Sequence, residues 1–295
     1  MTLDYCELSS DSLKEIAGLS TLGNLKTLKL QGNRIGATKF AELAASGVLR
    51  NLTELDLTCN DIEDITSITY IASLENLTKL DPQENGMGDA GVAILAASEA
   101  LKTLTTLNLA LNDLSAKGAK AIAKSTTFIN LKILLLGSNG IGDEGVAALA
   151  DSPVLGNLTT IDLVANNISH LGAQSLADSL TLTSLTILHL GANKIGSIGA
   201  KALAESTTLI NLALLGLSNN GIGNKGLIYL AVSTALKNLK ILWLRSNYID
   251  NDGLKDLANK MTLNLTFLDL GNNYISDEGR EAVKDFLLKT NVRTY

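Results

Sequence analysis

The fold of this chain can be worked out from residues 131–157, which have the sequence LKILLLGSNGIGDEGVAALADSPVLGN. Leucines stand at the first, fourth and sixth positions of this segment, and Asn139 stands at the ninth. The same pattern recurs at intervals of 25 to 27 residues. Its asparagine column is Asn33, Asn60, Asn85, Asn112, Asn139, Asn166, Asn193, Asn220, Asn247 and Asn273. A nearly constant period of this length predicts a solenoid of stacked repeats.

Each repeat is predicted to contain a short strand, a turn and a short helix. Leu134 and Leu136 alternate, so they share one face of an extended segment. Asn139 follows at the turn, where its amide can donate to and accept from backbone groups that face the core. Val146 and Leu149 then recur at helical spacing and form an apolar stripe. Burial of both apolar faces requires stacked neighbours, so nearest-neighbour contacts should supply most of the stability.

The pattern LxxLxLxxNxI resembles that of leucine-rich-repeat proteins over the whole length of the chain. The second half of each unit, IGDEGVAALA in residues 141–150, resembles the ribonuclease-inhibitor-like subtype. Strands joined by helical crossovers wind right-handed. We therefore expect an α/β, right-handed leucine-rich-repeat solenoid (horseshoe) of about ten 27-residue repeats, with parallel strands on the concave face and helices on the convex face.

The repeats predict a single domain over residues 1–295. Residues 1–24 form a partial first repeat or N-terminal cap, and residues 265–295 form the last repeat and a charged C-terminal cap. Cys6 takes the place of the turn asparagine in the partial repeat, where we expect it to be buried. A helix at about residues 12–19 is expected to follow it.

One stretch departs from the pattern. Residues 60–88 are two residues short of the regular spacing, and Pro82 takes the place of an inward leucine. Proline lacks the N–H that a strand donates to its neighbour. We expect a local irregularity here, and we interpret it as a tolerated defect.

Composition limits the cellular setting. No apolar run approaches the roughly 20 residues of a membrane helix, and the first residues lack the pattern of a signal peptide. The chain has two cysteines, Cys6 and Cys59, which fits a reducing compartment. Known ribonuclease inhibitors are cysteine-rich, so the resemblance fails on this point. We expect a cytoplasmic protein, or one secreted into a host cell without a cleavable signal peptide.

The charge of the chain indicates which kinds of partner it can bind. The net charge is −6, with 12 basic and 18 acidic side chains in residues 1–147 and 12 of each in residues 148–295. Nucleic acids and anionic membranes require a basic surface, so neither is expected as the partner. A protein partner with a basic surface is favoured instead.

The sequence predicts no catalytic, cofactor or metal site. The two histidines, His170 and His189, lie at different offsets, with His170 expected in a loop, and neither has a nucleophile at a catalytic spacing. Asp56 and Asp81 share a column in adjacent repeats, which admits a calcium site or an acid–base pair. We favour the alternative that Lys79 and solvent relieve their repulsion. No small-molecule substrate is expected.

Residues six, four and two positions before each turn asparagine should point away from the core. In the C-terminal repeats, these positions and those just after the turn carry large apolar, aromatic or basic side chains. The predicted protein-binding residues are Ile187, His189, Leu214, Ile241, Trp243, Arg245, Tyr248, Phe267 and Tyr274. Gly216 is expected to leave open space beside Trp243. Such a composition is typical of an interface hot spot.

We therefore predict a non-enzymatic scaffold that binds a protein on the concave sheet face. By analogy with bacterial repeats, it is interpreted as an effector secreted by an intracellular bacterium. Two alternatives stay open. One is a regulator of a small GTPase, because the Ran GTPase-activating protein has similar repeats, although its acidic tail has no counterpart here. The other is a targeting module of a larger enzyme such as a ubiquitin ligase.

Overall fold

The computed structural model describes residues 1–289 and 292–293. Strands and helices alternate along the chain, and strands β1 to β10 comprise three residues each. The strands are β1 (Thr27–Lys29), β2 (Glu54–Asp56), β3 (Lys79–Asp81), β4 (Thr106–Asn108), β5 (Ile133–Leu135), β6 (Thr160–Asp162), β7 (Ile187–His189), β8 (Leu214–Gly216), β9 (Ile241–Trp243), β10 (Phe267–Asp269) and β11 (Val292–Arg293). The α-helices are α1 (Ser10–Gly18), α2 (Gly36–Ala45), α3 (Ile65–Ala72), α4 (Gly88–Ala97), α5 (Ala116–Lys124), α6 (Gly142–Ala150), α7 (His170–Asp178), α8 (Gly196–Glu205), α9 (Gly223–Ala231), α10 (Asn251–Lys260), α11 (Asp277–Ala282) and α12 (Lys284–Lys289).

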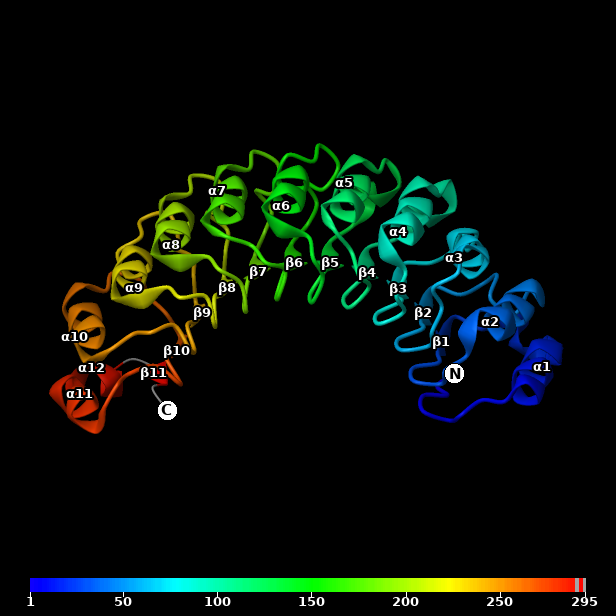
Figure 1. The fold of residues 1–295 in the computed structure, drawn as a ribbon, viewed down its shortest axis with the longest axis horizontal. Helices are drawn as coiled ribbons and strands as arrows, with labels where there is room; N and C mark the ends of the chain where they lie inside the picture. The colour runs from blue at the N-terminus through cyan, green and yellow to red at the C-terminus, as the bar shows by residue number, and fades with distance from the viewer. Residues whose placement is uncertain (290–291, 294–295) are drawn as a thin grey trace. The chain divides into compact units, whose positions relative to one another are not determined.

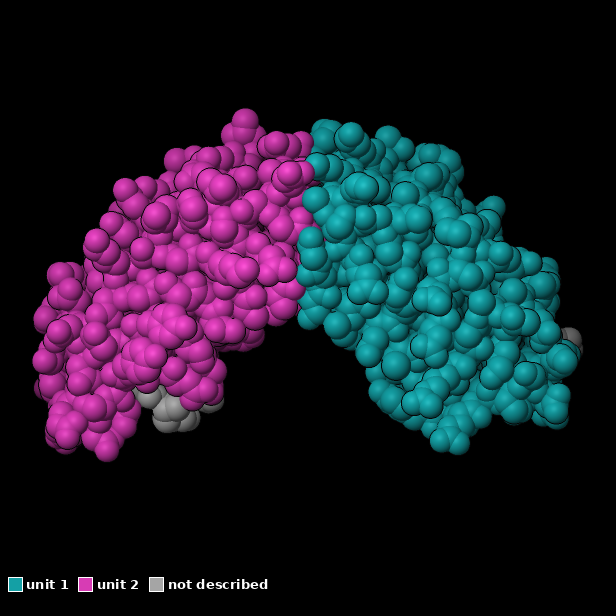
Figure 2. All heavy atoms as spheres, viewed as in Figure 1, with its two compact units in different colours: residues 1–140, 152–158 teal, residues 141–151, 159–295 magenta. Residues whose placement is uncertain are grey.

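The chain forms two compact units (Figure 2). Unit 1 comprises residues 1–140 and 152–158, and unit 2 comprises residues 141–151 and 159–295. In unit 1, strands β1 to β5 pair in parallel and in sequence order. In unit 2, strands β6 to β11 do the same. Within each unit the helices lie on one side of the strands (Figure 1), which confirms the predicted α/β solenoid. A single domain over residues 1–295 stays a prediction.

The repeated leucines build the core. In residues 131–157, Leu134 and Leu136 point inward from the strand segment and are fully buried, as are Val146 and Leu149 of α6. The inward side of the strand segment and the apolar stripe of the helix are therefore both buried, as the alternation of two periods in the sequence predicted. Residues on either side of each inward strand residue are mostly half-exposed, which leaves one face of strands β1 to β10 to solvent. We call this solvent-facing side the strand face.

The turn asparagines form the predicted column of hydrogen bonds. The Asn60 side chain donates from Nδ2 to the carbonyl oxygens of Leu57 at 3.0 Å and Leu30 at 2.8 Å. Its Oδ1 accepts from the backbone N–H of Asn33 at 3.2 Å. Each asparagine therefore closes its own turn and joins it to the preceding repeat. Buried turn groups that would otherwise lack partners are satisfied in this way.

A second column, which the sequence analysis did not identify, lies after the helices. Its members are Ser98, Ser125, Ser152, Ser179, Ser206 and Ser233. Each donates from Oγ to an alanine carbonyl at the end of the helix in the preceding repeat. The Ser179 bond to Ala150, for example, measures 2.6 Å. Carbonyls at helix ends have no partner inside the helix. The serine column supplies that partner from the next repeat.

The expected irregularity around Pro82 is confirmed. Elsewhere in unit 1, the residue after a strand donates its N–H to the next strand, as Leu57 does to Asp81 at 2.8 Å and Leu109 to Leu135 at 2.8 Å. Pro82 has no N–H to donate, and β3 shares only two register pairs with β4. The preceding short segment still forms α3, whose N-cap Asp64 accepts from Ser67 N–H at 3.1 Å.

Both ends differ in detail from the prediction. The Cys6 N–H donates to Asn33 Oδ1 at 2.9 Å, so Cys6 does occupy a turn position, but its side chain is exposed rather than buried. A thiol cannot bridge two turns as an amide does, and Sγ donates to Asp4 O within its own turn at 3.4 Å. The charged C-terminal segment forms two helices, α11 and α12. Residues 290–291 and 294–295 of the predicted cap lie outside the described residues.

Among residues 1–289 and 292–293, no helix combines the length and the apolar character that a membrane crossing requires.

Candidate functional site

Four large apolar side chains form a row on the strand face of unit 2. Ile187, Leu214, Ile241 and Phe267 are register partners on β7, β8, β9 and β10, and all four are half-exposed. Neighbouring strands lie about 4.8 Å apart, so side chains in register are in contact range. We call these residues the apolar row. The predicted alignment of these four residues is confirmed.

The adjacent row contains His189, Gly216, Trp243 and Asp269, again in register. The rings of His189 and Trp243 stack with centroids 5.3 Å apart and planes inclined by 25°. They meet above Gly216, where a Cβ atom would lie 3.0 Å from His189 Nδ1 and 3.4 Å from Trp243 Cε3. The expectation of open space at Gly216 is therefore wrong. The missing side chain allows the two rings to close over the intervening strand.

Arg245 lies two residues beyond Trp243 and pairs with Asp269. The distance from Arg245 Nε to Asp269 Oδ2 is 3.4 Å. Asp269 also accepts from the N–H of Gly271 at 2.9 Å, which fixes its carboxylate. Arg245 keeps much of its side chain exposed. The pair therefore holds an exposed guanidinium on the strand face, where it can contact another molecule.

Tyr248 and Tyr274 lie just past the turn asparagines of their repeats. Their rings stack with centroids 5.9 Å apart and an interplanar angle of 17°. They are 64% and 67% exposed, so two aromatic faces are held together in solvent. The backbone supports this arrangement, because Tyr274 N–H donates to Ile249 O at 2.7 Å. All nine predicted binding residues thus lie in unit 2, from β7 to the turn after β10.

The corresponding columns of unit 1 carry charge. Asp56 and Asp81 are register partners, as predicted, but Lys79 pairs with Glu54 at 2.8 Å rather than with either aspartate. Asn108 Nδ2 donates to Asp81 Oδ2 at 3.1 Å. Burial, and then the neighbouring Asp56 charge, raise the pKa of Asp81 above its ordinary value, although the Asn108 bond acts in the opposite direction.

A hollow of about 240 Å³ lies over this charged part of unit 1. Its lining includes Glu54, Asp56, Lys79 and Asp81 together with Asn108.

Among the described residues, no group of three or more histidine, cysteine, aspartate or glutamate side chains is arranged to hold a metal ion. His170 is the first residue of α7 rather than a loop residue, because Ser169 Oγ caps that helix by accepting from Leu171 N–H at 3.1 Å.

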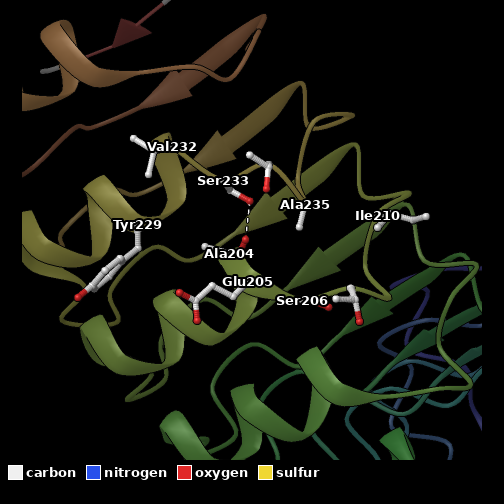
Figure 3. A pocket seen from close by; sticks show the side chains of 10 residues that line it. Ala204, Glu205, Ser206, Ile210, Tyr229, Val232, Ser233 and Ala235 are labelled. Atoms are coloured by element: carbon white, nitrogen blue, oxygen red, sulfur yellow. Dashed lines mark hydrogen bonds between the residues drawn. The ribbon is translucent and has the colours of Figure 1, made fainter.

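Another hollow, of about 540 Å³, lies where α8 and α9 end in unit 2 (Figure 3). Tyr229 of α9 and Val232, which follows that helix, line it together with Glu205 of α8. The Ser233 bond to Ala204 O at 2.5 Å, which belongs to the serine column, crosses it. None of the residues that line this hollow is one of the nine predicted protein-binding residues. The hollow follows from the packing of successive repeats.

Comparison with known families agrees with the repeat geometry. A family model described as "Leucine Rich repeat" matches six segments, residues 48–65, 100–123, 129–150, 181–204, 210–231 and 263–284. The chain contains leucine-rich repeats.

Two solved structures are similar to this chain. An internalin, inlF from Listeria monocytogenes, is 18% identical over 100% of this chain and 96% of its own length, with a TM-score of 0.41. TLR13, solved in a complex with ssRNA13, is 25% identical over 88% of this chain and 40% of its own length, with a TM-score of 0.46.

Proposed function

We propose that this protein is a non-enzymatic scaffold that binds a protein partner through the strand face of unit 2. The observation that carries the proposal is the apolar row beside the stacked rings of His189 and Trp243. Soluble proteins rarely expose contiguous apolar and aromatic patches without a binding role. Tryptophan, tyrosine and arginine are also the residues that most often dominate binding energy at interfaces.

Leucine-rich-repeat domains generally mediate protein–protein interaction, which supports this assignment. A solenoid suits the role because side chains on the strand face can vary while the leucines beneath them stay unchanged. We propose a protein partner with a basic surface, because the net charge is −6. The same charge disfavours a nucleic acid.

The finer identity is part of the proposal. The IGDEGVAALA segment favours the ribonuclease-inhibitor-like subtype, and the low cysteine content favours a bacterial effector that acts inside a host cell. The two free cysteines fit a cytoplasmic setting. A small-GTPase regulator and a targeting module of a larger enzyme are the alternatives. Stimulation of GTP hydrolysis by the purified protein would support the first, and a catalytic domain encoded in a longer reading frame would support the second.

The test is a double substitution in the centre of the surface. Trp243→Ala with Arg245→Ala should weaken capture of the partner at least tenfold, as expected for loss of hot-spot side chains. The melting temperature should change little, because both side chains lie on the strand face rather than in the core. Affinity capture from host-cell lysates and from lysates of the source cell measures the first quantity, and thermal unfolding measures the second.

A matched control uses the same two columns in unit 1. Lys29 and Gln31 stand four and two residues before Asn33, as Trp243 and Arg245 stand before Asn247. Lys29→Ala with Gln31→Ala should leave capture unchanged. Capture that survives the Trp243 and Arg245 substitutions would overturn the proposed surface.

A further inference from the structure

The stack of His189 on Trp243 brings a titratable ring into the middle of the proposed surface. The two residues are on β7 and β9, and the strand between them contributes only Gly216 at this register. The ring centroids are 5.3 Å apart. A side chain at Gly216 would separate the rings, since even a Cβ atom would lie 3.0 Å from His189 Nδ1. The contact therefore depends on three strands in one register.

The groups that face His189 can be named strand by strand. On β6, Asp162 is its register partner, and the Asp162 carboxylate is oriented by the Val164 N–H, which donates to Oδ1 at 2.8 Å. On β8, Gly216 contributes no charge. On β9, Trp243 presents its ring. The next charge along the row is Asp269, which is paired with Arg245. In this row His189 thus stands next to Asp162 on one side and, across Gly216, stacks on the indole of Trp243 on the other.

An imidazolium at this position would face both neighbours. A carboxylate attracts the positive charge directly, and an indole attracts it through the negative potential over its ring. Histidine is also the side chain that ordinarily changes charge between pH 5 and 8. Protonation of His189 would therefore strengthen a contact that already exists and would add one positive charge beside the apolar row.

We propose that the His189–Trp243 stack is a proton-responsive contact that switches the charge of the binding surface. Near neutral pH and above, the rings form a neutral aromatic surface that a partner can cover. In mildly acidic solution, the imidazolium is held between Trp243 and Asp162, and a covering partner must remove its hydration. Burial of a charge without a new partner is costly, and a basic partner is also repelled. Acidification should therefore release the partner, a consequence that rests on the proposed function.

The switch itself can be tested without any partner. Trp243 is the only tryptophan of the chain, so its fluorescence reports on this contact alone. A protonated imidazole quenches an adjacent indole more strongly than the neutral ring does. On titration of the purified protein from pH 8 to pH 5, the emission should fall in one step. His189→Gln should abolish the step.

His170→Gln is the matched control, because His170 is exposed at the start of α7 and is the other histidine of the chain. It should keep the step. Gly216→Val separates the rings while keeping both, so it should remove the step, with circular dichroism used to verify folding. If Gly216→Val does not fold, Gly216→Ala serves the same purpose, with an expected reduction in the step. A wild-type protein without a step, or a step that persists in His189→Gln, would overturn the proposal.

Binding supplies a separate measurement. Once a partner has been captured, the wild-type protein should lose affinity between pH 7.5 and 5.5 by at least threefold more than His189→Gln does. An equal loss in both proteins would overturn the release of the partner by acid. If the fluorescence step is present but the Trp243 and Arg245 substitutions leave capture intact, the switch is supported and the proposed function fails.

Discussion

The strand faces of unit 1 and unit 2 present different chemistry at equivalent positions. Four residues before the turn asparagine, unit 1 has Lys29, Asp56, Asp81, Asn108 and Leu135, and unit 2 has Asp162, His189, Gly216, Trp243 and Asp269. The leucines beneath both sets are buried alike. Polar groups of unit 1 contact one another, as in the Glu54–Lys79 pair, whereas unit 2 gathers rings and aliphatic side chains. The repeat thus fixes the backbone and leaves the outward chemistry free to differ.

The largest effect should come from what the two units share. Leu136 in unit 1 and Leu244 in unit 2 stand at the same offset and are fully buried. Replacement of either one by alanine should lower the free energy of unfolding by about 2–5 kcal/mol, through lost burial and a residual cavity. Urea denaturation measures the change. Similar losses would confirm a common core, and an unchanged midpoint for either variant would refute its inward assignment.

A smaller effect should follow when unit 2 is given a residue typical of unit 1. Ile241 stands in the column that holds Thr27 and Thr106 in unit 1. Ile241→Thr should cost less than about 1 kcal/mol of stability, because threonine is also β-branched and the position is half-exposed. Partner affinity should fall about tenfold. A variant with full affinity would show that the apolar row does not distinguish the two strand faces.

The smallest effect concerns the aspartate pair of unit 1. Asp56→Asn removes the charge opposite Asp81 and should raise the free energy of unfolding at pH 7 by about 0.2–1 kcal/mol. The pKa of Asp81 is raised, so the folded protein binds that proton more tightly than the unfolded chain. The associated stability is fully present below the unfolded pKa and is lost as pH rises through the folded pKa. The gain should therefore shrink on acidification, as measured by urea midpoints at several pH values.

Lys124→Ala serves as the control for this change, because it alters charge in unit 1 at the exposed end of α5, away from the aspartate pair. A stabilisation by Asp56→Asn that is equally large at pH 3 and pH 7 would contradict the electrostatic explanation. Packing at the site would then account for the difference.

Much of the fold could be predicted because its determinants recur at a fixed spacing. Leu134, Leu136 and Asn139 each have one role in every copy, so one segment explains the others. The serine column shows what was overlooked: Ser98 to Ser233 recur every 27 residues, and the same comparison of copies would have identified them. Cys6 could not be placed by analogy, because its thiol lacks the amide that holds Asn33 inside the turn.

The exposure and alignment of the candidate residues were predictable, whereas their contacts with one another were not. Strand alternation places His189 and Trp243 on the exposed face, and register aligns them. Whether two rings meet across a strand depends on side-chain rotation and on the space over Gly216, neither of which a repeat pattern contains. The pairing of Arg245 with Asp269 likewise depends on side-chain rotation, which the repeat pattern does not contain. A long side chain can reach several neighbours, and the three-dimensional structure is needed to identify the one that it contacts.

The proline at position 82 has a consequence for how cooperatively unit 1 unfolds. A repeat array stays cooperative only while each interface is strong enough to couple the repeats on its two sides. The step from β3 to β4 has one backbone hydrogen bond fewer than its neighbours. We therefore expect partial opening of unit 1 to begin there, with β1 to β3 losing protection from amide exchange while β4 and β5 remain protected. Pro82 would thus mark a boundary between two folding segments within an otherwise continuous core.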